Sequence, residues 1–569
     1  RGVAAARLDS SLDADAVRTL WRDLRAGVTK LLYVAPERFG SERFLQQLQS
    51  LRISLLVIDE AHCISEWGHN FRPDYLKLAR FAQQLKLHPV LALTATATEA
   101  VARDICQSFE IAPQAYVNTG FHRPNLQMTA RVLSPEQRLQ SLIASLRERP
   151  GASVVYVTLQ RTAEELATAL QAEGFEAEAY HAGLGSEIRG AIQDRFMASP
   201  SGLVVATIAF GMGIDKADIR NVFHFNPPKS LENYAQEIGR AGRDGLPATV
   251  ELLACPEDAL TLENFVYGDT PEPAALQALV QDLLAQGETI ELSVYELSSR
   301  YDIRQGVIRT LLCYLELAQV LSYTGPFYDS CKLSFRRPQA EVLARFDPQR
   351  REFLNAVLAQ GKAGRIWTSL ELSETARALD QPRDRILRAL NYLEEQGEIE
   401  LQVANLRLAY RLEQRPADLA ELVAELLQRF EAAETRDIAR VKQVFELAAS
   451  PACLVAGLLD YFGEKLPGPC GHCDRCLDQW QPPMASPPPL LGQAERALIG
   501  RVAAEGHAAL ASARRLARFV CGLASPATQQ GRPRLVGLPS FGALSRFQFA
   551  QVLAATEAIL GQSPTTKAQ

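Results

Sequence analysis

The chain has 569 residues, more than the ~250–300 at which a single hydrophobic core stops growing, so we expect about three to five domains. Hydrophobic residues make up 47% and charged residues 22% of the sequence, as in ordinary soluble globular proteins. The formal net charge of -6 neither supports nor excludes nucleic-acid binding, which must come from local basic surfaces. Runs of about 18 or more apolar residues are absent, which predicts that no segment spans a membrane.

Short apolar runs alternate with helical stretches through the first half of the chain. A first series lies at residues 31–34, 55–58 and 90–93, and a second at 154–157, 203–206, 222–225 and 250–253. This alternation predicts an α/β fold in which crossover helices join parallel strands. Two series predict two sheets, divided near residues 120–124. The uninterrupted apolar run at 55–58 predicts a strand buried on both faces.

Two adjacent carboxylates follow the run at 55–58, in the sequence Asp59-Glu60-Ala61-His62. Open α/β sheets bind their ligands at the carboxyl ends of strands. An aspartate there can hold a hydrated Mg²⁺ ion, and a neighbouring glutamate can polarise a water molecule toward a phosphate. The sequence therefore indicates a nucleotide-hydrolysis site, and Asp-Glu-Ala-His is a sequence that helicases use at such a site.

The next segment, residues 65–75, is rich in aromatic and basic side chains: Trp67, His69, Phe71, Arg72 and Tyr75. Aromatic rings stack on nucleic-acid bases, which contributes about 1–3 kcal/mol for each base, and arginine contacts phosphates. A buried aromatic cluster beneath a loop is the alternative interpretation. Directly after Asp-Glu-Ala-His, the segment resembles the aromatic-rich loop of RecQ-family DNA helicases. In that family the loop couples DNA contact to ATP hydrolysis.

A second motif occupies residues 236–245 and contains Arg240 and Arg243. Residues three apart lie on one face of a helix, so we expect both arginines to reach one anion. An arginine delivered from a second domain neutralises a transferring phosphoryl group, which is worth ~10³–10⁵ in rate; a solvated basic helix end is the alternative. Upstream, residues 206–216 match helicase motif V, where glycines allow close backbone approach. There we expect Asp215 to contact a ribose or the arginine helix.

The resemblance to the RecQ family covers residues 1–265 and then a cysteine-rich module. It implies two RecA-like lobes, ATP and Mg²⁺ as cofactors, and an ATP-dependent 3′–5′ DNA helicase acting in repair and recombination. The implied catalytic residues are Asp59, Glu60, His62, Gln236, Arg240 and Arg243. The implied nucleotide-site residues are Asp59, Glu60, Thr94, Gly213, Asp215, Arg240 and Arg243, although capping a helix would equally explain Thr94. The implied DNA-binding residues are Trp67, His69, Phe71, Arg72, Tyr75, Arg123 and Asn125.

The sequence contains no Gly-x-x-x-x-Gly-Lys-Ser/Thr motif. That loop provides the backbone cradle and the lysine for the β- and γ-phosphates. Residues 2–6 resemble the segment that follows this loop in RecQ proteins. We therefore expect an N-terminally truncated first lobe, and we expect the chain itself to hydrolyse ATP poorly.

Residues 276–412 have helical spacing of apolar residues, with two short strand-like runs at 320–323 and 332–335 around a Gly-Pro turn. This pattern, and a similar one at 372–408, predict two winged-helix-like modules in tandem. Arg309, Arg385 and Arg388 would face DNA if the second helix of each module recognises it. A role as a spacer between proteins is the alternative. Compact RecQ proteins lack such a segment here, so the chain resembles a minority of RecQ-like helicases with an alternative linker.

Four of the ten cysteines cluster late in the chain: Cys453, Cys470, Cys473 and Cys476. This spacing predicts a closed, tetrahedral structural zinc site that adds ~10–16 kcal/mol to local folding. Residues 458–464 resemble the RecQ zinc-binding domain. An iron–sulfur cluster is one alternative, and a buried Cys453 thiol with His472 as the fourth ligand is another. The remaining cysteines are scattered, which favours a reducing cytosol over a disulfide framework.

The predicted domains are a partial first lobe (1–120), a second lobe (121–270), the two-module linker (276–412), a zinc-binding domain (413–480), a Pro-rich linker (481–489) and a helical region (490–569). In the last, Arg514, Arg515 and Arg518 form a basic edge, for which a solvated face is favoured over DNA contact.

We expect a monomer in the cytoplasm, or at the nucleoid of a bacterium. Expected partners are single-stranded and forked DNA, a single-stranded-DNA-binding protein and repair proteins. A non-hydrolysing DNA-binding adaptor is the alternative function. An RNA helicase is disfavoured by the aromatic loop and the cysteine module.

Overall fold

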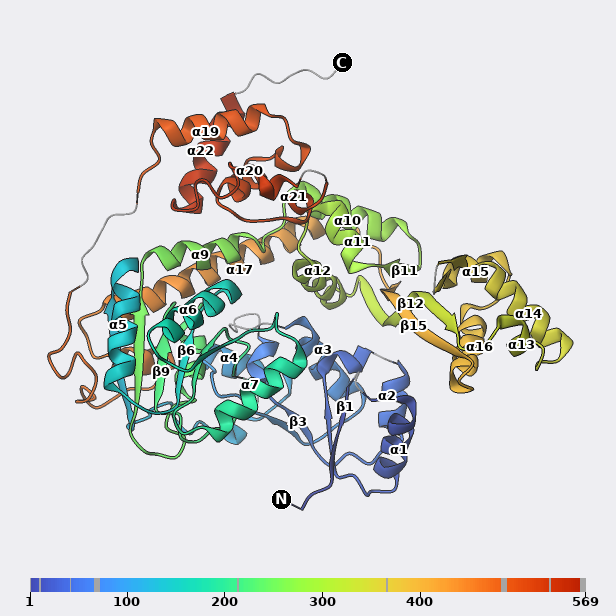
Figure 1. Cartoon of the computed structure of the whole chain (residues 1–569), viewed down its shortest axis with the longest axis horizontal. Coiled ribbons are helices and arrows are strands. Elements are labelled where there is room, and N and C mark those ends of the chain that lie inside the picture. The colour runs from blue at the N-terminus through green and yellow to red at the C-terminus, as the bar shows by residue number, and fades with distance from the viewer. Residues whose placement is uncertain are drawn as a thin grey trace. The chain divides into compact units, whose positions relative to one another are not determined.

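The computed structural model describes residues 2–9, 12–40, 42–65, 72–211, 214–364, 367–482, 489–531 and 534–562 (Figure 1). The chain divides into two compact units. The first contains Arg1–Arg52 and Ala274–Val423, and the second contains Ile53–Pro273 and Ala424–Gln569. None of the helices in the described ranges has the length and hydropathy needed to cross a bilayer.

A six-stranded parallel sheet forms the centre of the second unit, in the order β5-β10-β9-β6-β8-β7. Its strands are β5 (Leu126–Val132), β6 (Ser153–Tyr156), β7 (Ala177–Tyr180), β8 (Leu203–Ala206), β9 (Asn221–His224) and β10 (Ala248–Ala254). The four inner strands confirm the apolar runs of the second predicted series. The two edge strands, β5 and β7, were not predicted. Edge strands are covered less completely, so they carry polar residues such as Gln127 and Glu178 that break the apolar run.

Helices cover both faces of this sheet, which confirms the predicted α/β class. Helices α5 (Pro135–Glu148) and α6 (Gln160–Ala172) contribute Leu142 and Leu170 to one apolar layer. The opposite layer is formed by α7 (Ser186–Ala198), α8 (Leu231–Ile238), α17 (Leu419–Ala449) and α18 (Leu454–Tyr461). The two layers shield the inner strands from water, as a parallel sheet requires.

Two further strands of the second unit, β3 (Leu56–Ile58) and β4 (Val90–Ala92), pair in parallel with Val57 beside Leu91. Helices α3 (Pro73–Gln84) and α4 (Glu99–Ser108) bury the face that contains Ile58. The prediction that residues 55–58 are buried on both faces is wrong, because Val57 is 46% exposed and Leu91 is 43% exposed. Only one face of this strand pair is covered within the described residues.

The first unit contains another parallel pair, β1 (Ala5–Leu8) and β2 (Leu31–Val34), together with α1 (Ala14–Arg25) and α2 (Glu42–Gln49). Trp21 and Phe44 from the two helices are buried and contact each other edge to face, with ring centroids 6.0 Å apart. On β2, Leu31 is 45% exposed and Tyr33 is 65% exposed. This pair also presents an apolar face that the described residues leave open.

The first unit also contains a five-stranded antiparallel sheet in the order β11-β15-β12-β14-β13. Its strands are β11 (Thr289–Leu292), β12 (Leu321–Phe335), β13 (Lys362–Ala363), β14 (Thr368–Glu371) and β15 (Ile399–Leu412). Helices α10 (Pro273–Ala285), α11 (Val294–Tyr301) and α12 (Gln305–Leu317) precede β12. Helices α13 (Gln339–Leu343), α14 (Pro348–Ala359), α15 (Leu372–Ala378) and α16 (Arg383–Glu395) lie between β12 and β15 (Figure 1).

The prediction that the two helical modules follow one another in tandem is therefore wrong. The second module, which contains α13 to α16, is inserted between β12 and β15, and these two strands pair as one long ribbon. The predicted turn at Gly325-Pro326 is also wrong. These residues lie inside β12, where the pairing with β15 shifts register between Tyr323 and Gly325. Along this stretch β12 pairs only with β15, since β14 pairs further along at residues 330–333. Prolines in sheets are found where one side of the strand is unpaired, as β12 is here.

The C-terminal helices α19 (Gln493–Ala504), α20 (Ala513–Val520), α21 (Pro526–Gln529) and α22 (Phe549–Gln562) enclose a core of their own. For Arg514 and Arg518, the favoured prediction of a solvated basic edge on α20 is wrong, because both side chains bind other parts of the protein. Arg518 is 8% exposed and donates hydrogen bonds to the carbonyl oxygens of Tyr267 and Thr270. Arg514 forms an ion pair with Glu434. These arginines attach the C-terminal helices to the end of α9 (Glu257–Tyr267) and to α17.

We expect Arg518→Met to lower the free energy of unfolding by ~1–3 kcal/mol, because the carbonyl oxygens of Tyr267 and Thr270 would lose the hydrogen bonds that Arg518 donates. Arg496→Met is the matched control, since Arg496 is exposed on α19 of the same domain. Calorimetric unfolding of the two variants measures the difference. Equal unfolding temperatures for the two variants would contradict the anchoring role.

Candidate functional site

The Asp-Glu-Ala-His sequence begins where β3 ends. Glu60 adopts a left-handed conformation with a φ of 50°, which residues with a side chain rarely occupy outside turns and functional sites. Its own N–H donates to Asp59 Oδ1 at 2.9 Å. This tight turn fixes both carboxylates at the carboxyl end of the strand, where the sequence predicted them, and leads into the short 3-10 helix η2 (Ala61–Ile64).

The next strand brings a hydroxyl group to the same place. His62 is 1% exposed, and its Nδ1 lies 2.9 Å from Thr94 Oγ1, just beyond β4. The same ring nitrogen lies 3.3 Å from Glu60 Oε2. Because β3 and β4 are adjacent and parallel, their carboxyl ends meet at one edge. Glu60, His62 and Thr94 therefore form one connected polar group.

Helix α8 contributes the contact that completes this group. Gln236 Nε2 donates to Glu60 Oε1 at 3.3 Å, across 176 positions of sequence. Burial and the nearby Asp59 charge raise the pKa of Glu60, while Arg240, Arg72 and the Gln236 hydrogen bond partly oppose them. A carboxylate with a raised pKa accepts a proton more readily, as a general base must.

The two arginines of the second motif lie on a turn, not on a helix face as predicted, because α8 ends at Ile238. Arg240 is 9% exposed and donates to the carbonyl oxygen of Gly211. A Cβ at Gly211 would lie 2.5 Å from the Arg240 guanidinium, so the close approach predicted for the motif V glycines occurs here. Arg243 donates to Asp215 Oδ1 at 2.9 Å. The expected contact of Asp215 with the arginine segment is therefore present, and its contact with a ribose stays a prediction.

Arg123 and Asn125, which the sequence assigned to DNA, hold the turn that carries the two arginines. Arg123 donates to the carbonyl oxygens of Ala241 and Gly242, each at 3.0 Å. Asn125 Nδ2 donates to the Gly242 carbonyl oxygen at 2.8 Å. These bonds give both side chains a positioning role, and contact of either with DNA stays a prediction.

The aromatic segment is described only at its two ends, since Trp67, His69 and Phe71, like Gly213 of motif V, lie outside the described residues. The N–H of Arg72 donates to the Cys63 carbonyl oxygen at 3.0 Å, so the segment closes directly beside η2. Arg72 is exposed, and its contact with DNA stays a prediction. Tyr75 is 9% exposed, and burial raises its pKa to about 12. At this position the Tyr75 ring packs inside the protein and does not present an open face on which a base could stack.

A cavity of about 460 Å³ adjoins these groups. Its polar lining includes Glu60, Gln236, Arg240 and Arg243. Its apolar lining includes Phe121, Leu126, Leu458 and Phe462. The polar wall thus combines a carboxylate that can activate water with guanidinium groups that can neutralise an anion.

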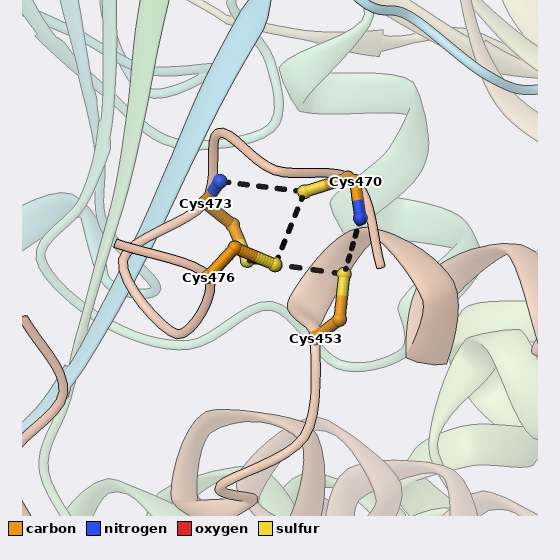
Figure 2. Close-up of side chains that lie close together, drawn as sticks. All are labelled: Cys453, Cys470, Cys473 and Cys476. Atoms are coloured by element: carbon orange, nitrogen blue, oxygen red, sulfur yellow. Dashed lines mark hydrogen bonds between the residues drawn. The ribbon is translucent and has the colours of Figure 1, made fainter. Parts of the chain in front are cut away.

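The predicted metal ligands converge, as Figure 2 shows for Cys453, Cys470, Cys473 and Cys476. Three Sγ–Sγ distances are 3.8 Å (Cys470 to Cys476), 3.9 Å (Cys473 to Cys453) and 3.5 Å (Cys473 to Cys476). Tetrahedral zinc with bonds of about 2.3 Å would separate its sulfur ligands by about 3.8 Å. The four thiols therefore fit a zinc ion.

The alternative ligand set with His472 in place of Cys453 is wrong. Within the described residues, the metal-ligating group consists of the four cysteines, and His472 Nδ1 instead lies 2.8 Å from the Cys470 carbonyl oxygen. Cys453 is the N-cap of α18, where its Sγ accepts the N–H groups of Ala456 and Cys470. Burial acts to raise the pKa of Cys453, but these N–H donors, together with the side chains of Cys470 and Cys476, lower it to about 7.

Sequence reasoning missed the contacts between the cysteine module and the second lobe, of which two involve residues 461–464. The N–H of Phe121 donates to Glu464 across 343 positions, and the Tyr461 hydroxyl donates to Glu232 across 229 positions. No local periodicity marks such partners. The resemblance of residues 458–464 to a known domain was the one available signal.

Three family models match the chain. They are the DEAD/DEAH box helicase model at residues 2–105, the helicase conserved C-terminal domain at 135–245 and the RecQ zinc-binding model at 416–477. Among solved structures, S. cerevisiae Dbp5 bound to RNA and ADP BeF3 is 17% identical with a TM-score of 0.35, over 46% of this chain and 66% of that one.

Curated relatives match more of the chain. ATP-dependent DNA helicase Q-like 5 of Arabidopsis thaliana is 29% identical over 494 residues, which is 81% of this chain and 54% of that protein. ATP-dependent DNA helicase RecQ of Bacillus subtilis is 40% identical over 261 residues, 46% of this chain and 44% of that protein. The chain thus spans about half the length of the curated relatives it matches. The three matched domains follow one another in chain order, and together with these relatives they are consistent with a RecQ-family superfamily-two helicase.

Proposed function

We propose that the protein is an ATP-dependent DNA helicase of RecQ type, which unwinds duplex DNA by moving 3′ to 5′ along one strand in repair and recombination. The observation that carries this proposal is the Glu60 carboxylate, which shares one cavity with Gln236, Arg240 and Arg243 from the second lobe. The relatives' names support ATP and DNA as ligands. The 3′–5′ direction rests on family resemblance.

In this mechanism Glu60 takes the proton of the attacking water, and Gln236 holds the Glu60 carboxylate in place. Asp59 would hold a Mg²⁺ ion, which neutralises phosphate charge when bound. Arg240 and Arg243 would stabilise the charge on the transferring phosphoryl group. Arg240 donates to the Gly211 carbonyl in the present structure, so ATP must compete with that bond.

Hydrolysis also needs the phosphate loop, which residues 1–569 do not contain. We propose the activity for a protein that has such a loop. The open apolar face of the β3–β4 pair supports a covering layer of polypeptide on that pair, since parallel sheets are normally covered on both faces. A second candidate is a non-hydrolysing DNA-binding adaptor. The retained Glu60–Gln236 contact argues against it, because an adaptor has no use for a general base.

We also propose that the four cysteines hold a structural zinc ion, because four thiolates close its coordination and leave no open position for chemistry.

Glu60→Gln in the full-length protein should lower DNA-stimulated ATP hydrolysis by roughly 10²–10⁴-fold, because the amide cannot accept the water's proton. Affinity for single-stranded DNA should stay within about twofold. Glu148→Gln, at an exposed position on α5, is the control. Phosphate-release and DNA-binding assays measure the two effects. Wild-type turnover in Glu60→Gln would show that Glu60 is not the general base.

The pH dependence of hydrolysis should reflect the raised pKa of Glu60. The base works only when deprotonated, so activity should fall as pH drops, with a midpoint above the ordinary carboxyl value of 4.5. Gln236→Ala should move this midpoint to still higher pH, because the Gln236 hydrogen bond lowers the pKa of Glu60. Gln107→Ala, at an exposed position on α4, should leave the midpoint unchanged. A midpoint that Gln236→Ala moves downward would argue against Glu60 as the base.

Cys473→Ser should reduce bound zinc from one ion per chain to a small fraction and lower the unfolding temperature, because metal binding stabilises the module by ~10–16 kcal/mol in comparable sites. Cys106→Ser, outside the cluster on α4, should retain the metal. Elemental analysis checks both variants. Iron with inorganic sulfide in the wild-type protein would instead establish an iron–sulfur cluster.

A further inference from the structure

The last residue of α18 and the turn after it, residues 461–464 of the cysteine module, touch the connection between the two lobes. The N–H of Phe121 donates to Glu464 Oε2 at 2.5 Å. The Phe121 ring stacks on Phe462, with centroids 4.3 Å apart and planes inclined by 16°. Phe121 lies between η3 (Pro113–Ala115) and β5, on the segment that joins the region of β3 and β4 to the six-stranded sheet. One backbone donor and one ring of this connection are thus held by the module.

The same turn meets the first residue of α4. Gly463 has a φ of +81°, and a Cβ built there would lie 2.8 Å from Glu99 Oε1. A side chain at position 463 would therefore both strain the backbone and displace Glu99. Glu99 begins the helix that follows β4 and Thr94, so the turn contacts the β3–β4 side as well as the connection.

A third contact reaches the helix that carries Gln236. The Tyr461 hydroxyl donates to Glu232 Oε1 at 2.7 Å, and Glu232, on α8, is 2% exposed. Arg440 Nε of α17 lies 3.8 Å from the same carboxylate oxygen. A buried carboxylate is stable only with such partners, so the Tyr461 hydroxyl fixes the position of α8.

The module itself is attached to the sheet and to the thiol cluster. The Asp474 N–H donates to the Met128 carbonyl oxygen at 3.1 Å, and Arg475 donates to the Ala130 carbonyl oxygen at 2.7 Å, both on the edge strand β5. Helix α18 begins at its cap Cys453 and ends at Tyr461. A single short helix therefore joins the thiol cluster to the turn.

We propose that the turn 461–464 sets the inter-lobe connection, and that Tyr461 and Glu464 are positioning residues for nucleotide hydrolysis. Glu464 fixes the connection at Phe121, and Tyr461 fixes α8, which presents Gln236 to Glu60. The part concerning hydrolysis rests on the proposed function. The contacts themselves do not.

Hydrogen–deuterium exchange on the full chain tests the contacts without any need for ATP hydrolysis. Glu464→Ala should speed exchange in residues 116–123 at least about tenfold, because the Phe121 amide loses its acceptor. Tyr461→Phe should do the same in α8. Lys465→Met is the control, since it breaks the exposed 2.8 Å pair between Lys465 and Asp460, the residues that flank the turn. Exchange equal to that of Lys465→Met would overturn the proposal, as would faster exchange that comes only with loss of the bound metal.

Turnover in a full-length protein that hydrolyses ATP separates positioning from general stability. Glu464→Ala should lower kcat at least about fivefold with an unchanged KM for ATP, and Glu464→Gln, which keeps an oxygen acceptor, should restore it. Wild-type kcat in Glu464→Ala overturns the positioning role and leaves the proposed function standing. Absence of hydrolysis in the wild-type protein overturns the proposed function and with it the positioning role, whereas the exchange result still decides the contacts.

Discussion

The hydrogen bond from Gln236 to Glu60 is the contact on which the candidate site depends. It joins a turn after β3 to a helix on the six-stranded sheet, and it opposes part of the cost of burying Glu60 next to Asp59. A partly buried carboxylate beside another carboxylate needs donors and cations. Arg240 and Arg72 supply the positive charge. The turn after β3 and the segment that contains α8 and Arg240 must therefore keep their positions relative to each other.

Carbonyl groups hold the arginine turn in place. Arg240 donates to the Gly211 carbonyl, and Arg123 donates to carbonyls of the turn itself. Buried guanidinium groups are costly unless such acceptors satisfy them, so the turn is specified by its acceptors more than by helix propensity. The short chain around Gly239 and Gly242, the latter with a φ of +55°, permits this departure from the helix. The arginines thereby reach the cavity from a turn.

The module between the second lobe and the cysteine cluster shows how an insertion can be accommodated. Strands β12 and β15 pair along almost their whole length, so the helices between them are carried at the far end of one ribbon. The core of the inserted module combines Leu333 of β12 and Ile399 of β15 with Leu390 of α16. Ribbon and insertion thus share apolar contacts, which explains why the chain can leave and re-enter the first module without a separate linker.

The inner strands β6, β8, β9 and β10, the carboxylates after β3 and the four thiols could be predicted from the sequence alone, because each is marked by local periodicity or spacing. Tertiary structure decided the edge strands β5 and β7, the nesting of the modules and the burial of Arg518. It also decided that Tyr461 reaches Glu232 and that Arg123 supports a turn. These features depend on which distant segments become neighbours, and a residue's local pattern carries no record of its partner on another element.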